Sequence, residues 1–170
     1  NPLMRFFGMN HTAYSEVLEA LAIADANPKV DRVQLNVNSP GGQASGLFRV
    51  VDSIKALTKP VVAVADYAAS AAYAIAAATG RIEARGPASS FGSIGVAAEF
   101  AVDEKIVTIT STESPDKRPD VTTEEGRAVI REQLDAVHEL FVSGIAASRG
   151  TTTAKVNETY GRGKTFLADG

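Results

Sequence analysis

Residues 61–78, VVAVADYAASAAYAIAAA, give the clearest indication of the fold in this 170-residue chain. The first five of them are all valine or alanine, and a short continuous apolar run of this kind is typical of a strand covered on both faces. The stretch turns alanine-rich from Ser70 onward and is followed by Thr79-Gly80, which predicts a helix over residues 70–78. A buried strand that leads directly into a helix is the building unit of an α/β fold.

The same stretch is the one part of the chain that resembles a membrane-spanning helix. Ten of its residues are alanine, which barely favours insertion, and Asp66 and Ser70 interrupt it. A carboxylate at the bilayer centre costs about 2.5–3.5 kcal/mol on insertion scales. We therefore expect buried globular structure here and no membrane contact from this chain. The N-terminal residues also lack the pattern of a secretory signal.

Helical and extended periodicities alternate on both sides of this stretch, which predicts a single α/β domain over residues 1–170 with a mainly parallel sheet. The predicted elements, in chain order, are a helix at 14–26, a strand at 33–37, a helix at 44–54, the strand and helix described above, a strand at 81–85, a loop at 86–92, a strand at 105–110, a long helix opened by the capping pattern at 122–125 and ended by Gly150, a short helix at 154–160 and an extended segment at 164–167.

Composition excludes several classes of function. The chain has no cysteine, which rules out disulfides and thiolate metal sites, and its two histidines form no zinc-binding cluster. The formal net charge is −3 with no basic run, whereas a nucleic-acid surface needs clustered lysine and arginine. We therefore expect no metal, no cofactor and no nucleic-acid partner.

Two strand-to-helix junctions carry residues that could do chemistry, because open α/β folds place reactive groups at the carboxyl ends of strands. At the first, Gly41 and Gly42 follow a predicted strand and could turn backbone N–H groups toward a developing oxyanion. An ordinary Pro-Gly turn is the alternative. At the second, Ser70 lies at the start of a helix, whose dipole stabilises negative charge on a nearby oxygen. A helix-capping serine is the alternative there.

A serine nucleophile needs a base, and the sequence offers two kinds. His11 precedes the first predicted helix and His138 lies inside the long one, so neither stands in a loop typical of a catalytic imidazole. A lysine can serve if burial lowers its pKa toward neutrality. Lys117 lies in the proline-bracketed segment 114–120, and Lys105 is the rival candidate at the entry of a predicted strand.

Taken together, the chain resembles the signal peptide peptidase A family over nearly its whole length. Four motifs follow the family's order: NSPGG at 38–42, KPVVA at 59–63, AASAAYAIA at 68–76 and GSIGV at 92–96. This family of Ser–Lys peptidases shares the fold of the Clp protease and crotonase superfamily and includes the phage capsid-assembly (prohead) proteases. The resemblance implies a superhelix of β-β-α units. It also implies a peptidase domain that continues past residue 170.

The resemblance implies a role for each of the reactive side chains. Ser70 would be the nucleophile, Lys117 the general base, and Ser93 the residue that orients the lysine amine. Ala71-Ala72 stand where the family often has Gly-Gly, and Asp116 precedes Lys117 where several members have tyrosine. Clp proteases carry a histidine in the loop corresponding to 89–96, and its absence here favours the lysine dyad.

Backbone groups would complete the site. The N–H groups of Gly42, with Gly41 as its neighbour, and of Ala71 would form the oxyanion hole. The peptide substrate would add as a strand beside Gly42 and beside the edge formed by Ile94, Gly95 and Val96. Because the site is lined by alanine, we expect small residues next to the cleaved bond.

The implied function is a serine endopeptidase that cleaves scaffold or capsid proteins as a phage prohead matures in the host cytoplasm. One alternative is a bacterial signal-peptide peptidase, in the cytoplasm or held at the membrane by an anchor outside these residues. Another is a crotonase-like acyl-CoA enzyme or an inactive binding module on the same fold. The expected partners are a protein or peptide substrate and further copies of the chain, because the superfamily forms rings and the long helix has a broad apolar face.

Overall fold

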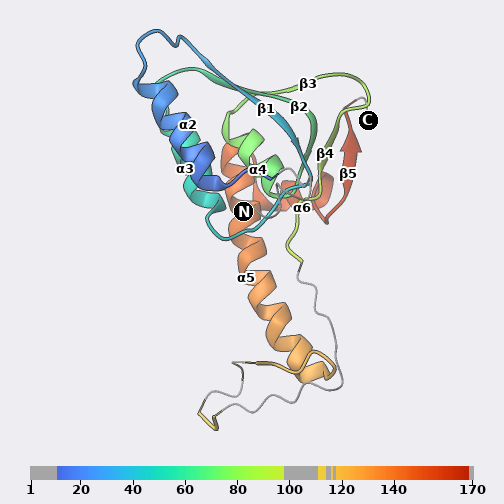
Figure 1. Ribbon diagram of the computed structural model, residues 1–170. Helices are drawn as coiled ribbons and strands as arrows, with labels where there is room; N and C mark the ends of the chain where they lie inside the picture. Colours follow the sequence, from blue (N-terminus) through green and yellow to red (C-terminus); the bar gives the residue numbers. More distant parts are fainter. Residues whose placement is uncertain (1–10, 98–110, 114–115, 117, 169–170) are drawn as a thin grey trace.

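A mainly parallel five-stranded sheet organises the molecule (Figure 1). The structure is a computed structural model that describes residues 11–97, 111–113, 116 and 118–168. Strand β2 is central, with β1 on one side and both β3 and β4 on the other, all parallel to it, while β5 is antiparallel to β4. The strands are β1 (Val33–Ser39), β2 (Val61–Ala69), β3 (Ile82–Ala84), β4 (Ser90–Gly92) and β5 (Thr165–Leu167).

One helix, α4, packs against strands β1 and β2, and the other helices pack around α4 or on its neighbours. The helices are α2 (Tyr14–Ala26), α3 (Leu47–Lys55), α4 (Ala71–Ala78), α5 (Glu124–Arg149) and α6 (Thr153–Thr159). Every residue of α4 except Ile75 is buried, and its small alanine side chains let α3, α5 and β2 approach it closely. In the part of the chain that the structure describes, no helix combines the length and apolar character needed to cross a membrane.

The two halves of helix α5 differ in how they pack. Its C-terminal half packs against α4 and α6 and contributes Phe141, Val142 and Ile145 to the core. Its N-terminal half projects away from the sheet (Figure 1), and there Gly126 is the buried residue. The helix ends at Gly150, whose φ of 60° is the left-handed conformation that suits a C-cap.

Two predictions about the central strands were wrong, and tertiary pairing explains both. Strand β2 does not stop at residue 65 but continues to Ala69, so that it leads straight into Ser70. The segment predicted as a loop at 86–92 contains β4, which pairs with residues 67–69 of β2. A three-residue strand has too little periodicity to be recognised alone. The strand predicted at 105–110 lies outside the described residues.

Candidate active site

Ser70 lies at the turn between β2 and α4 in a backbone conformation that residues other than glycine rarely adopt. Its φ is 52° and its ψ is −126°. The amide of Ser70 donates to the carbonyl oxygen of Gly92 (2.8 Å), and the carbonyl oxygen of Ser70 accepts from the amides of Tyr73 (2.9 Å) and Ala74 (3.2 Å). Hydrogen bonds from both its amide and its carbonyl oxygen therefore keep Ser70 in this strained conformation. Strained backbone of this kind concentrates at functional sites.

The hydroxyl of Ser70 does not cap α4. A capping serine accepts a hydrogen bond from an amide of the first helical turn, and Ser70 makes no such bond. The capping alternative therefore does not explain this serine. The sharp turn from a strand into a helix is instead the geometry that exposes the nucleophile in a nucleophile elbow.

The loop after β1 lies directly against Ser70. A Cβ built on Gly41 would lie 2.7 Å from Cβ of Ser70 and 2.9 Å from the carbonyl oxygen of Ala69, so only glycine fits there. The φ of Gly41 is +111°, which also favours glycine. Strands β1 and β2 are parallel with Ser39 opposite Ala68, so both loops leave the same edge of the sheet. The two predicted junctions are thus one site.

Two backbone amides at this site are available to a ligand. The amide of Gly41 donates to Oγ of Ser39 (3.2 Å) and is therefore engaged. Among the hydrogen bonds of the described residues, none engages the amide of Gly42 or of Ala71. Ala71 is the first residue of α4, where amides lack intrahelical acceptors and the helix dipole is positive. These two amides could stabilise a developing negative charge.

Ser93 lies beside Ser70 at the end of the neighbouring strand. Ala69 and Gly92 are register partners in β2 and β4, so the two serines follow at adjacent strand ends. Ser93 is half-buried with a φ of 52°, and its amide donates to the carbonyl oxygen of Lys164 (2.6 Å). Gly92 must be glycine, because a Cβ there would lie 2.5 Å from that same carbonyl oxygen.

The residues expected to bind the substrate strand differ in their exposure. Ile94 is fully buried, and its carbonyl oxygen already accepts from the amide of Gly163 (2.9 Å). Gly95 and Val96 are half-buried. Of the three residues, Ile94 therefore anchors the segment, and Gly95 and Val96 are the ones with surface left for a ligand.

The candidate bases are only partly covered by the structure. Lys117 and Lys105 both lie outside the described residues, although Asp116 and Arg118 on either side of Lys117 are exposed. His138 is half-buried within α5. The lysine assignment therefore stays a prediction.

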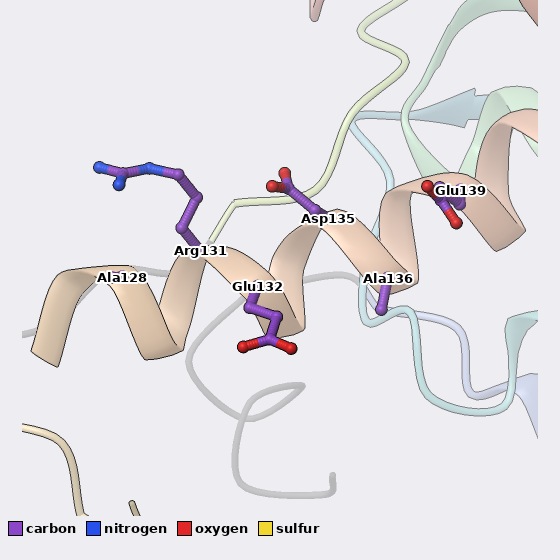
Figure 2. Close-up of a pocket in the computed structure, with 6 residues that line it drawn as sticks. All are labelled: Ala128, Arg131, Glu132, Asp135, Ala136 and Glu139. Atoms are coloured by element: carbon purple, nitrogen blue, oxygen red, sulfur yellow. The ribbon is translucent and has the colours of Figure 1, made fainter. Parts of the chain in front are cut away.

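A pocket on α5 is a separate feature (Figure 2). All six of its lining residues come from that one helix, and none belongs to the loops around Ser70: Ala128, Arg131, Glu132, Asp135, Ala136 and Glu139. Its carboxylates do not make it a metal site, since no group of three histidine, aspartate or glutamate side chains among the described residues could hold an ion. It is the polar face of the projecting half of α5.

Two residues that support the loop after β1 were not predicted from the sequence. The hydroxyl of Ser39 interacts with both the amide (3.2 Å) and, at the long distance of 3.4 Å, the carbonyl oxygen of Gly41. Tyr14, interpreted from the sequence as one residue of a helix face, donates from its hydroxyl to the carbonyl oxygen of Gln43 (2.6 Å). Ser39 could have been noticed as a turn-forming residue next to the glycines, but no sequence signal links residue 14 to residue 43.

Two protein-family models match this chain. Residues 53–170 match the model of Peptidase family S49, and residues 7–89 match that of Clp protease. A ClpP1 mutant from Listeria monocytogenes has a similar fold, with a TM-score of 0.55 and 15% identity, covering 92% of this chain and 76% of that one. These findings confirm the resemblance and the predicted fold class.

Two phage proteins are related in sequence. The head-tail preconnector protein GP5 of Enterobacteria phage P21 is 31% identical in an alignment 167 positions long that covers 91% of this chain and 33% of that protein. The capsid assembly protease C of Escherichia phage lambda is 29% identical in an alignment 170 positions long that covers 92% of this chain and 38% of that protein. This chain thus spans only about a third of each relative.

Proposed function

We propose that this chain, which belongs to peptidase family S49, is the proteolytic domain of a serine endopeptidase that cleaves scaffold or capsid proteins during phage prohead maturation. The observation that carries the proposal is the geometry of Ser70. Its hydroxyl is not used to cap α4, its backbone is strained, and the loop at Gly41 lies against it. A residue serving only the fold would need none of these features.

In the proposed reaction, Ser70 attacks the carbonyl carbon of the cleaved peptide bond. Lys117 in its neutral form accepts the proton from the hydroxyl, and the amides of Gly42 and Ala71 stabilise the negative carbonyl oxygen. The lysine then gives the proton to the leaving amine. The amine departs, and the acyl group stays on Ser70 as the acyl-enzyme. A water molecule, deprotonated by the lysine, hydrolyses the ester, and the proton returns to Ser70.

Ser93 is proposed to hold the amine of Lys117 in position by a hydrogen bond. The support is its place at the strand end next to Ser70 and its positive φ, which is shared with Ser70. The hydrogen bond from the amide of Ser93 to the carbonyl oxygen of Lys164 fixes its backbone next to β5. A base-orienting partner is a common requirement, because a correctly placed nucleophile is ineffective if its base can rotate away.

The substrate class follows from the relatives and from the lining of the site. A segment in extended conformation would pair beside Gly42 and beside Gly95 and Val96, as added strands do. The related phage proteins are named for capsid assembly and the head-tail connection, which favours capsid or scaffold proteins in a prohead as substrates. The small residues around Ser70 favour small side chains next to the cleaved bond.

Assembly of several copies is part of the proposal. Helix α5 carries Ile130, Leu134 and Val137 only half-buried, and Leu140 is 61% exposed. Apolar side chains along one helix are a suitable surface for association with another copy. Analytical ultracentrifugation of the wild type and of Leu140→Glu would test this, because a purely monomeric wild type would contradict it.

Covalent labelling tests the proposed nucleophile. We expect a fluorophosphonate probe to modify Ser70, identified by mass spectrometry of the labelled peptide, and Ser70→Ala to abolish both labelling and cleavage of an alanine-rich peptide. Ser143→Ala, an exposed serine of α5, is the matched control and should keep both. Cleavage by Ser70→Ala at the wild-type rate would refute the proposal. Absence of both labelling and cleavage in the wild type would favour a binding module.

A further inference from the structure

A side chain from α2 contacts the loop that lies on Ser70. Tyr14, the first residue of α2, donates from its hydroxyl to the carbonyl oxygen of Gln43 at 2.6 Å, across 29 positions of the chain. Burial raises the pKa of Tyr14 above the ordinary value of a phenol, so the hydroxyl keeps its proton throughout the neutral range. It is therefore a permanent donor to this loop.

The aromatic ring of Tyr14 packs under the same loop. A Cβ on Gly46, whose φ is +84°, would lie 3.3 Å from Cδ2 of Tyr14, and a Cβ on Gly42 would lie 3.7 Å from its hydroxyl oxygen. Both Gly42 and Gly46 of the loop therefore lie next to Tyr14. Glycine at position 46 both permits the left-handed turn and leaves room for the ring.

Tyr14 is also the tie between this loop and a distant element. The other hydrogen bonds of residues 40–46 among those of the described part of the chain are local: Ser39 with Gly41, and the amide of Leu47 with the carbonyl oxygen of Ala44 (3.2 Å). On its other side, Gly41 touches Ser70. The loop is therefore held between Tyr14 and Ser70.

We infer that Tyr14 is a positioning residue for the oxyanion loop, and this inference rests on the proposed function. By fixing the peptide after Gln43, the hydroxyl limits the orientations of Gly42, whose amide is a proposed donor to the oxyanion. An oxyanion hole is effective only if its donors are already oriented when negative charge develops. The role is indirect, because Tyr14 touches the loop and not the reacting atoms.

The test compares Tyr14→Phe with Tyr160→Phe, which makes the same chemical change at a half-buried tyrosine that lies after α6. Two quantities are measured: hydrogen–deuterium exchange of residues 40–46, and the rate and half-saturation concentration of fluorophosphonate labelling. We expect Tyr14→Phe to speed exchange of the loop and to slow the maximal labelling rate about three- to tenfold, with the half-saturation concentration and unfolding temperature nearly unchanged. Tyr160→Phe should change neither exchange nor labelling.

The outcomes separate this inference from the proposed function. Unchanged loop exchange and an unchanged maximal labelling rate in Tyr14→Phe would overturn the inference while the proposed function stands. A wild type that is never labelled would overturn the proposed function and the catalytic part of the inference with it, and loop exchange would still show whether Tyr14 holds the loop. A slower rate that follows a general loss of stability, equal in both variants, would also overturn it.

Discussion

The N-termini of α4 and α5 use hydroxyl side chains in opposite ways. At α5, Thr123 has an extended backbone (φ −94°, ψ 159°), and its hydroxyl accepts from the amide of Gly126 at 3.0 Å. Thr152 at α6 does the same toward the amide of Lys155 at 3.2 Å. At α4, Ser70 has a positive φ and its hydroxyl caps nothing.

Residue type and position alone therefore do not distinguish a capping hydroxyl from a reactive one. All three residues are serine or threonine at the residue before a helix, where both are favoured. What distinguishes Ser70 is its backbone, whose turn leaves the amide of Ala71, at the start of α4, without an acceptor among the hydrogen bonds of the described residues. At Thr123 the hydroxyl stabilises its own helix, whereas at Ser70 the helix start is free to stabilise a ligand.

The largest expected effect comes from removing the proposed proton acceptor. Ser70, before α4, needs such a base to act as a nucleophile, whereas Thr123, before α5, only caps its helix. We expect Lys117→Met to lower the rate of peptide cleavage about 10³-fold or more, as loss of a catalytic base commonly does. Circular dichroism should show an unchanged fold. Arg118→Met, the matched loss of the neighbouring charge, should cleave nearly as the wild type does. Comparable rates in the two variants would remove Lys117 from the mechanism.

Next in size is the contact that brings the glycine loop onto Ser70. Gly41→Ala places a methyl group 2.7 Å from Cβ of Ser70 and forces alanine to a φ of +111°, so we expect a loss of about 2–3 kcal/mol in the free energy of unfolding, together with loss of labelling. Gly150→Ala, at a φ of +60° with open space around it, should cost about 1 kcal/mol and leave labelling intact. Urea denaturation measures both. Equal costs would show that the contact at Gly41 is not tight.

The strain at Ser70 predicts a gain of stability when it is relieved. Ser70→Gly removes the steric cost of a positive φ, about 1–3 kcal/mol, against a glycine entropy cost of about 0.5–1 kcal/mol. We expect a net stabilisation of about 1 kcal/mol in urea unfolding and complete loss of activity. Ser70→Ala keeps the strained φ and should gain nothing. A destabilised glycine variant would contradict the interpretation that this backbone is strained.

The reciprocal change at α5 should affect stability alone. Thr123→Ala removes the hydrogen bond to the amide of Gly126, for which we expect a loss of about 1 kcal/mol in the free energy of unfolding. Labelling of Ser70 should proceed at the wild-type rate. A slower rate would mean that the start of α5 contributes to the site. Thr123→Ser, which keeps the capping oxygen, is the control.

The smallest expected effect is a pH dependence just before α5. The hydroxyl of Thr122, and then its amide, donate to the carboxylate of Asp120 and lower the pKa of Asp120 below the ordinary value. Because the folded pKa is the lower one, this stabilisation is present above the unfolded pKa and is lost as the pH falls through the folded pKa. An NMR titration should show the lowered midpoint, and Thr122→Val should move it back toward the ordinary value. An unmoved midpoint in Thr122→Val would assign the shift to the amide.

The helices and the longer strands could be predicted because each carries its own signal. Helix α2 spans 14–26 as expected, ending before Asn27-Pro28, and α5 ends at Gly150 as the C-cap rule requires. Strand β4 could not be predicted, because its three residues become a strand only by pairing with β2. The pattern at 122–125 correctly predicted where α5 begins, but the helix has no capping box. The N-cap is Thr123, and the third residue of the helix is Gly126, which has no side chain to complete the box.

Local signals along the chain were enough to predict the order of strands and helices, the two glycines after β1 and a serine at the start of an alanine-rich helix, since periodicity, turn residues and small side chains are local properties. Tertiary structure decided that these two junctions meet, because parallel pairing of β1 with β2 brings Gly41 onto Ser70. Long-range pairing also explains why the Ser70 hydroxyl does not cap α4, since the pairing of Ala69 with Gly92 and the hydrogen bond from the Ser70 amide to the carbonyl oxygen of Gly92 fix its backbone. Long-range contacts of this kind leave no periodicity in the chain from which they could be inferred.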